Sequence, residues 1–187
     1  SGTTAIGNGR GTQYDGILLG HQASTSNNVI GGTTVADRNV ISGNYGGGVW
    51  MSASAGGNTV RGNYIGTNAA GTAAIGNSQH GVILTGSGNS VIGNVIGGNG
   101  GGSYYVMYAP TSSYNTIIQS NLVGVGADGT TAIGNSSHGI YLESDGNLVG
   151  GLTAGLGNTI ANNSGKGIVV TNTAQQNGIY RNSIYSN

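Results

Sequence analysis

The sequence has no cysteine, no phenylalanine, one proline, and only 5% charged residues among its 187. Without cysteine there are no disulfides, no thiol catalysis and no thiolate metal sites. Five basic side chains balance five acidic ones, so the chain lacks the charge needed to follow a nucleic-acid backbone or an anionic membrane surface. No run approaches the roughly 18 apolar residues of a membrane span. We therefore expect neither nucleic-acid binding nor membrane insertion.

Glycine, in contrast, is abundant, with 40 residues, about three times its average usage. It does not occur at every third position, which excludes collagen. Glu, Lys and Gln are scarce while Asn, Ser and Thr are common, and this composition disfavours helices. Zero net charge argues against a disordered chain. We expect one all-β domain over residues 1–187, and such an uncharged composition is common in extracellular and cell-surface proteins.

Internal repeats dominate the sequence. The heptamer Gly-Thr-x-Ala-Ile-Gly-Asn occurs at residues 2–8, 71–77 and 129–135. A unit Asn-x-(Val/Ile) starts at Asn28, Asn39, Asn58, Asn63, Asn89, Asn94, Asn115, Asn121, Asn147, Asn158, Asn177 and Asn182. A unit Gly-(Val/Ile)-x-(Leu/Met/Val) starts at Gly16, Gly48, Gly81, Gly139 and Gly167, and we predict that residues 105–107 fill the missing place. Such self-similarity is the signature of a repeat architecture.

Interleaving these units gives cycles of 24 to 37 residues, each with three short strand-like runs. The runs are too short, and their turns unsuitable, for hairpins within one cycle. Each can pair in parallel with the same run of the next cycle, about 4.8 Å away along an axis. The sequence therefore predicts a single-stranded parallel β-helix, a three-sided solenoid of about five full coils with a partial coil at each end.

The residue types within the runs predict which side chains face inward. The third position of each Asn-x-(Val/Ile) unit is always β-branched, whereas the middle position varies. Because strand side chains alternate between faces, we expect Val91 and Ile117 to point inward, and Ser90 and Thr116 to point outward. The repeated Asn is expected to stack in a ladder on the Asn of neighbouring coils.

This pattern resembles the right-handed parallel β-helix repeat family with a pectate-lyase-like fold, in particular its bacterial surface type. The matching motifs are Asn-x-Ile-Gly-Thr at residues 63–67, the heptamer at 71–77 and Gly-Val-x-Leu at 81–84. The resemblance covers essentially the whole chain and implies the fold. Its implications for function are broad, because such β-helices include polysaccharide lyases and hydrolases, phage tailspikes, and adhesin or autotransporter stalks.

A polysaccharide lyase or hydrolase of this kind requires clustered carboxylates, for calcium or for acid and base roles. The complete acidic inventory is Asp15, Asp37, Asp128, Glu143 and Asp145. Of these only Glu143 and Asp145 are close enough in sequence to share a site, which would be a weak calcium site. We assign no catalytic, cofactor-binding or metal residue.

His80 and His138 occupy equivalent places before Gly81 and Gly139, and Asp15 holds that place before Gly16. One cycle lies between the two histidines, which sets them about 10 Å apart. That is too far for one metal ion, so we interpret them as corner residues inherited from the repeat.

The middle positions of the Gly-(Val/Ile) runs are all apolar or aromatic, although they should face outward. They are Leu18, Trp50, Ile83, Val106, Tyr141 and Val169. An aligned stripe of this kind is a contiguous patch, which predicts a surface for another protomer or for a flat ligand. Trp50, Tyr141 and the tyrosines at 104, 105 and 108 are suited to stacking on sugar rings.

The chain begins and stops within a repeat. Residues 182–187 followed by 1–8 give 14 residues, close to the 15 of the internal segments 63–77 and 121–135. We hypothesise a head-to-tail homopolymer joined through Ile6, Asn182, Ile184 and Tyr185, since a heterologous contact that does not close generates a filament. The preferred function is thus a non-enzymatic extracellular structural subunit, in a filament or an adhesin stalk. The alternative is a carbohydrate-active β-helix enzyme or a carbohydrate-binding module.

Overall fold

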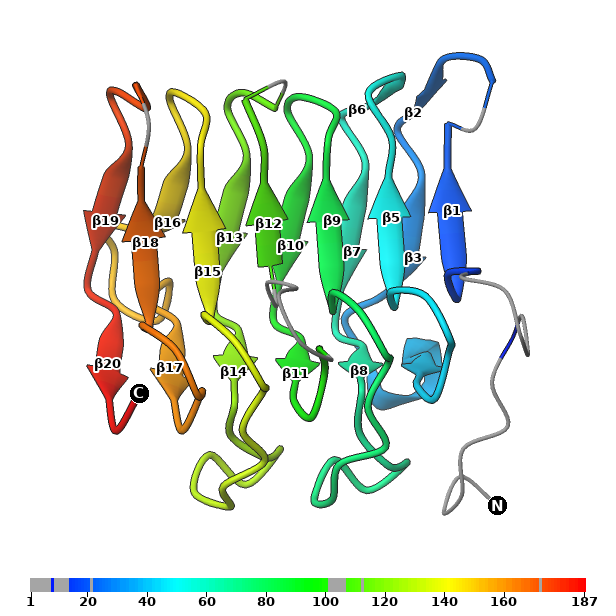
Figure 1. The fold of residues 1–187 in the computed structure, drawn as a ribbon, viewed down its shortest axis with the longest axis vertical. Helices are drawn as coiled ribbons and strands as arrows, with labels where there is room; N and C mark the ends of the chain where they lie inside the picture. The colour runs from blue at the N-terminus through cyan, green and yellow to red at the C-terminus, as the bar shows by residue number, and fades with distance from the viewer. Residues whose placement is uncertain (1–7, 9–13, 21, 101–106, 112, 172) are drawn as a thin grey trace.

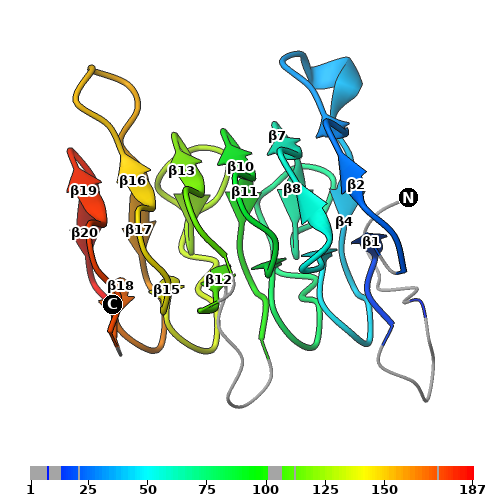
Figure 2. The same ribbon diagram turned by 90° about the horizontal axis from the view of Figure 1, so that it is seen from above.

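The computed structural model describes residues 8, 14–20, 22–100, 107–111, 113–171 and 173–187. The chain winds into a parallel β-solenoid in which every turn contributes one strand to each of three six-stranded sheets (Figure 1). All strand pairs between turns are parallel and join equivalent runs of successive turns. Seen from above, the turns form a row along one axis (Figure 2). The predicted three-sided β-helix is confirmed.

The three sheets are named here by their order in each turn. The first sheet consists of β1 (Ile17–Leu19), β5 (Val49–Met51), β9 (Val82–Leu84), β12 (Met107–Ala109), β15 (Ile140–Leu142) and β18 (Ile168–Val170). The second sheet consists of β3 (Val29–Gly31), β7 (Thr59–Arg61), β10 (Ser90–Ile92), β13 (Ile117–Gln119), β16 (Leu148–Gly150) and β19 (Gly178–Tyr180). The third sheet consists of β4 (Val40–Ile41), β8 (Tyr64–Ile65), β11 (Val95–Ile96), β14 (Leu122–Val123), β17 (Thr159–Ala161) and β20 (Ser183–Tyr185).

Two smaller elements complete the described chain. Strands β2 (Thr25–Ser26) and β6 (Ala55–Gly56) form a two-stranded sheet at one corner. The helix of the described residues is the single 3-10 turn η1 (Val35–Asp37). The described residues therefore contain no helix that is long and apolar enough to cross a membrane.

One continuous core runs along the inside of the solenoid. In the first sheet, the first and third residues of each strand point into the core. In β9, for example, Val82 and Leu84 are buried, whereas Ile83 between them is not. In the second and third sheets the inward residue follows the ladder position by two, as Val91 and Ile96 do after Asn89 and Asn94, and both are completely buried. The alternation predicted from the repeats is thus observed for most turns.

Three asparagine ladders hold successive turns in register. In each, the side-chain oxygen accepts hydrogen bonds from the backbone N–H and the side-chain NH2 of the Asn one turn earlier. Asn63 donates in this way to Asn94 Oδ1 at 2.9 and 3.2 Å, and Asn94 donates to Asn121 Oδ1 at 2.9 and 3.0 Å. Asn94 also donates to the Val60 carbonyl at 2.9 Å. Each buried Asn therefore satisfies its own polar groups and those of the next turn.

Two of the ladders were predicted from the Asn-x-(Val/Ile) units, and the third was not. The third ladder is built from the last residue of the heptamer and its equivalents: Asn8, Asn44, Asn77, Asn99, Asn135, Asn163 and Asn187. The repeat of that Asn at the end of every heptamer was the signal that would have identified it.

The predicted register is wrong in one turn. We expected Asn115 in the ladder, Thr116 outward and Ile117 inward, but Thr116 occupies the ladder position and is completely buried. Ile118 instead fills the core, pairing with Val91 and Val149 of the adjacent turns. Two adjacent isoleucines made both registers compatible with an apolar pattern, and a one-residue slip exchanges the faces of every side chain. Pairing with the neighbouring strands decides between them.

This register predicts a large difference between two adjacent substitutions. Ile118→Asp places an unpaired charge in the core, which should cost several kcal/mol and unfold the domain. Ile117→Asp should cost far less, because Ile117 is only half-buried and points outward. Thermal melts of the two variants test this. Equal destabilisation would contradict the register.

Thr116 interrupts the ladder formed by Asn28, Asn58, Asn89, Asn147 and Asn177. This interruption predicts a stabilising substitution. Within the described residues its Oγ1 is the buried side-chain atom that lacks a hydrogen-bond partner. Thr116→Asn would supply an acceptor for Asn89 and a second donor to Asn147, adding roughly 1–2 kcal/mol of stability. Thr116→Val is the matched control, because it removes the unpaired hydroxyl without restoring the ladder, and we expect it to be nearly neutral. A melt of Thr116→Asn at or below that of Thr116→Val would show that the ladder does not continue.

Candidate ligand-binding face

The outward side chains of the first sheet form one straight column. Its members are Leu18, Trp50, Ile83, Tyr108, Tyr141 and Val169, each paired in register with the next. Five of the six were predicted. The predicted Val106 lies outside the described residues, and Tyr108 takes its place because β12 begins at Met107. We call this row the outward column, and its members stand about 4.8 Å apart along the axis.

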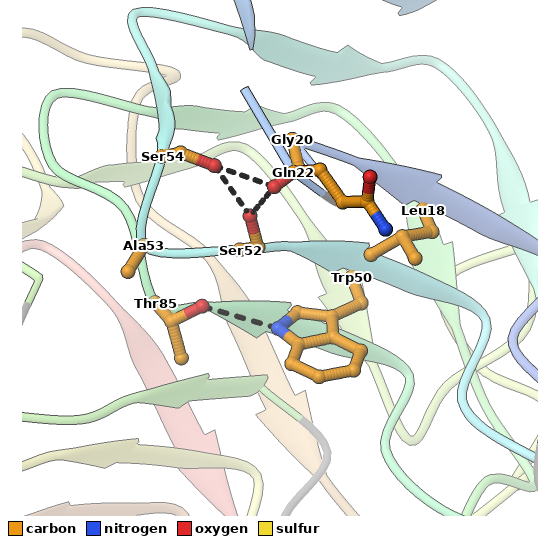
Figure 3. Close-up of a pocket in the computed structure, with 8 residues that line it drawn as sticks. All are labelled: Leu18, Gly20, Gln22, Trp50, Ser52, Ala53, Ser54 and Thr85. Atoms are coloured by element: carbon orange, nitrogen blue, oxygen red, sulfur yellow. Dashed lines mark hydrogen bonds between the residues drawn. The ribbon is translucent and has the colours of Figure 1, made fainter. Parts of the chain in front are cut away.

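Trp50 is the centre of a shallow groove on this face (Figure 3). The groove has a volume of about 610 Å³ and is lined by Leu18, Gly20, Gln22, Trp50, Ser52, Ala53, Ser54 and Thr85. The indole Nε1 donates to Thr85 Oγ1 at 3.1 Å, which fixes the ring, and 36% of the Trp50 side chain remains exposed. The groove therefore presents a fixed aromatic surface with a polar rim.

The groove's rim is held together by hydroxyl groups. Ser52 and Ser54 both donate to the carbonyl oxygen of Gly20, and Thr85 donates to the carbonyl of Met51 at 2.8 Å. Gly20 has a φ of +77°, a conformation that favours glycine. These three hydroxyls thus use their protons within the protein, and each hydroxyl oxygen can also accept hydrogen bonds: the Thr85 oxygen accepts from Trp50, and the Ser52 and Ser54 oxygens lie 3.1 Å apart.

A cluster of aromatic rings continues the face beyond Ile83. The His80 ring stacks on Tyr108 with centroids 5.6 Å apart, and the centroid of the His138 ring lies 5.8 Å from that of Tyr141. Each histidine thus packs against a tyrosine of the outward column, a contact that the sequence pattern did not indicate.

The two tyrosines of this cluster also contact each other. Tyr108 and Tyr141 meet edge to face with ring centroids 6.1 Å apart, and the Tyr108 hydroxyl donates to Glu143 Oε2 at 2.9 Å. The predicted aromatic partners Tyr104 and Tyr105 lie outside the described residues.

The carboxylates near this face are bonded to separate partners. Glu143 accepts from Tyr108, whereas Asp145 Oδ1 accepts from the backbone N–H of Gln175 at 2.6 Å. Among the described residues, no group of three or more His, Asp and Glu side chains is placed to hold a metal ion. The weak calcium site at Glu143 and Asp145 stays a prediction.

The pKa shifts also reflect local bonding. Burial raises the pKa of Asp15, and the Gly47 N–H, whose nitrogen lies 2.6 Å from Asp15 Oδ1, opposes that shift.

Asp128 and Asp37 lie in exposed turns. The Thr131 hydroxyl and N–H, with the Thr130 N–H, lower the pKa of Asp128 to about 2, and the Thr34 hydroxyl and N–H lower the pKa of Asp37.

The outward side of the third sheet differs because its middle is covered, although Val40 and Ser183 at its two ends are exposed. Its Tyr64 and Val95 are buried and pack with Ile133 from the loop that follows β14. The second sheet presents a mixed row that includes Thr59, Ser90 and Gly178. Among the described residues, the first sheet is therefore the one whose outward column is apolar or aromatic in every turn, with Leu18 and Trp50 exposed and the other four members half-buried.

The predicted axial junction lies on the last described turn. Ile184 pairs with Ile160, and 47% of its side chain is exposed, whereas Ile160 is completely buried. Tyr185 is similarly exposed, and Asn182 continues its ladder by accepting from Asn158. Ile6 lies outside the described residues.

Comparisons with known proteins agree with this architecture. A family model described as a right handed beta helix region matches residues 7–187. The crystal structure of a periplasmic alginate epimerase, a double mutant of AlgG, is similar with a TM-score of 0.63 and 17% sequence identity. The match covers 94% of this chain and 37% of that chain, and at this identity it shows the fold alone. None of the curated proteins compared with the sequence matches it.

Proposed function

We propose that this chain, which belongs to the right-handed β-helix family, binds a polysaccharide along the outward column of its first sheet. The observation that carries the proposal is the exposed Trp50 groove, in line with the tyrosines of the same column. The alternative predicted from sequence, a carbohydrate-binding β-helix, is thereby preferred to a purely structural subunit. We also propose a location outside the cytoplasm, which the uncharged composition and the periplasmic structural relative support.

The chemistry of the column suits a chain of sugar rings. The C–H groups on one side of a pyranose ring pack against aromatic faces, while a few polar groups fix the ring's orientation. Trp50 and Tyr108 are two strands apart, about 10 Å, and Tyr141 follows one strand later. A linear polymer lying along the solenoid axis would therefore meet an apolar or aromatic side chain at each turn.

Binding without turnover fits the carboxylates better than hydrolysis does. Glycoside hydrolysis uses two carboxyl groups that flank the scissile bond. Near the outward column, the described carboxylates Glu143, Asp145 and Asp15 are each hydrogen-bonded to a different group of the protein. We therefore propose a binding module, and an assay for new reducing ends or unsaturated products with the same polymers would detect an enzyme.

Trp50 provides both the test and its readout, because it is the only tryptophan in the chain. Titration with soluble polysaccharides, including alginate and neutral glycans, should change its fluorescence when a ligand covers the indole. Trp50→Ala should weaken binding about tenfold, equal to about 1.4 kcal/mol, when measured by calorimetry.

Tyr180→Ala is the control, since Tyr180 is an exposed aromatic residue on the second sheet. It should bind like the parent protein. If no polymer of the panel binds, or if Trp50→Ala and Tyr180→Ala have equal effects, the first sheet is not the binding face.

We propose axial stacking with a second copy as another function, favoured by the exposed Ile184. A further coil placed on β20 would bury Ile184 as β20 buries Ile160. In interior turns the ladder N–H donates to the next Asn, and at Asn182 that acceptor would come from the added coil. Head-to-tail copies would then share one core and continuous ladders.

Ile184→Lys tests this second function, because it places an unpaired charge in the shared core. The parent protein should self-associate with increasing concentration in sedimentation experiments, and the variant should remain monomeric with its interior turns folded. Leu152→Lys adds the same charge at an exposed loop position and should associate like the parent. A parent protein that stays monomeric at high concentration would exclude axial stacking.

A further inference from the structure

The charges around the Trp50 groove indicate which class of polysaccharide it takes. Resting on the proposed function, we infer that the ligand is an uncharged glycan and not a polyuronate such as alginate. None of the eight lining residues is ionisable. Among the described residues, the groove lining therefore offers no cation to pair with a carboxylate, and removing a carboxylate from water without such a partner is costly.

The described lysine and arginine side chains lie elsewhere, and the described histidines, His80 and His138, stack on Tyr108 and Tyr141, two and three strands from Trp50. Arg38 packs over the Tyr64 ring, 4.0 Å from its centroid, beside the third sheet. Arg61 belongs to β7 of the second sheet, and Arg181 lies between β19 and β20. Lys166 precedes β18, four strands from Trp50, or about 19 Å along the axis. None of these four side chains is placed to bind a ligand carboxylate over Trp50.

The acidic residues are closer to the face. Glu143 follows β15 and bonds to Tyr108 of the outward column, and Asp15 lies just before β1, whose Leu18 lines the groove. Of these two, Glu143 touches the column, so a polyanion lying along it would approach the Glu143 carboxylate. Like charges repel, so Glu143 disfavours a uronate on this part of the column and leaves a neutral sugar unaffected.

The hydrogen-bonding groups of the rim point to the same class. Ser52 and Ser54 donate their protons to Gly20, so they present acceptors to the groove. Gln22 is exposed and lines the groove, and its carboxamide supplies both a donor and an acceptor. Sugar hydroxyls can donate to such acceptors, whereas an ionised carboxylate only accepts. The rim is therefore complementary to hydroxyl groups.

A matched pair of ligands tests this inference. β-Mannan oligosaccharides and polymannuronate oligosaccharides of equal length differ at one carbon, which carries a hydroxymethyl group in the first and a carboxylate in the second. Titration of Trp50 fluorescence should give at least tenfold tighter binding of the neutral series. Gln22→Lys places a cation at the groove and should raise affinity for the uronate series severalfold, while Val29→Lys, on the second sheet, should leave it unchanged.

The possible outcomes distinguish a wrong ligand class from a wrong binding function. Tighter or equal binding of the uronate series to the parent protein would overturn the inference and leave the polysaccharide-binding face intact. Binding of a neutral glycan of another backbone, with no uronate binding, would support it. If neither charged nor neutral polymers bind, both the proposed function and this inference fall.

Discussion

The in-register stacking of one turn on the next is the constraint on which every other feature depends. It is maintained by buried asparagines, whose carboxamide carries a donor and an acceptor at one tip. Asn94 illustrates why this residue type repeats, because it accepts from Asn63, donates to Asn121 and also bonds the Val60 carbonyl. A buried backbone group without such a partner costs about 1–3 kcal/mol. The ladders therefore allow a narrow solenoid with few charged residues to bury its turn backbone.

The same stacking creates the candidate site. When turns repeat in register, the middle residue of every first-sheet strand falls in one column. On the third sheet the equivalent side chains Tyr64 and Val95 are covered by a loop that carries Ile133. On the first sheet Leu18 and Trp50 stay exposed. The outward column is thus a direct consequence of the repeat, and its end at Leu18 and Trp50 is more exposed than the middle of the third sheet, which Ile133 covers.

Polar groups around the column then define its chemistry. Thr85 orients the Trp50 ring, and Glu143 anchors the Tyr108 hydroxyl. The hydroxyl groups of Ser52 and Ser54 donate hydrogen bonds to the Gly20 carbonyl. An aromatic surface with a hydroxyl-rich, uncharged rim is suited to a ligand that has both apolar ring faces and hydroxyl groups. The similarity to an alginate epimerase concerns the fold. The proposal of an uncharged polymer as the ligand rests instead on the described lining of the groove, which holds no ionisable residue.

The sequence by itself determined the architecture, two of the three ladders and five residues of the outward column. It could do so because strand periodicity and the recurrence of Asn and Gly are local properties of one turn. Only the tertiary structure decided that Ile118 and not Ile117 fills the core, that Tyr108 completes the column, and that His80 stacks on it. In both misjudged strands, β12 and β13 of the same turn, more than one register presents apolar side chains to the core. Loop lengths differ between turns, so the choice depends on hydrogen bonds to the neighbouring turns. Ile117 bonds to Asn89 and Met107 bonds to Gly139, partners that lie 28 and 32 residues away in the sequence.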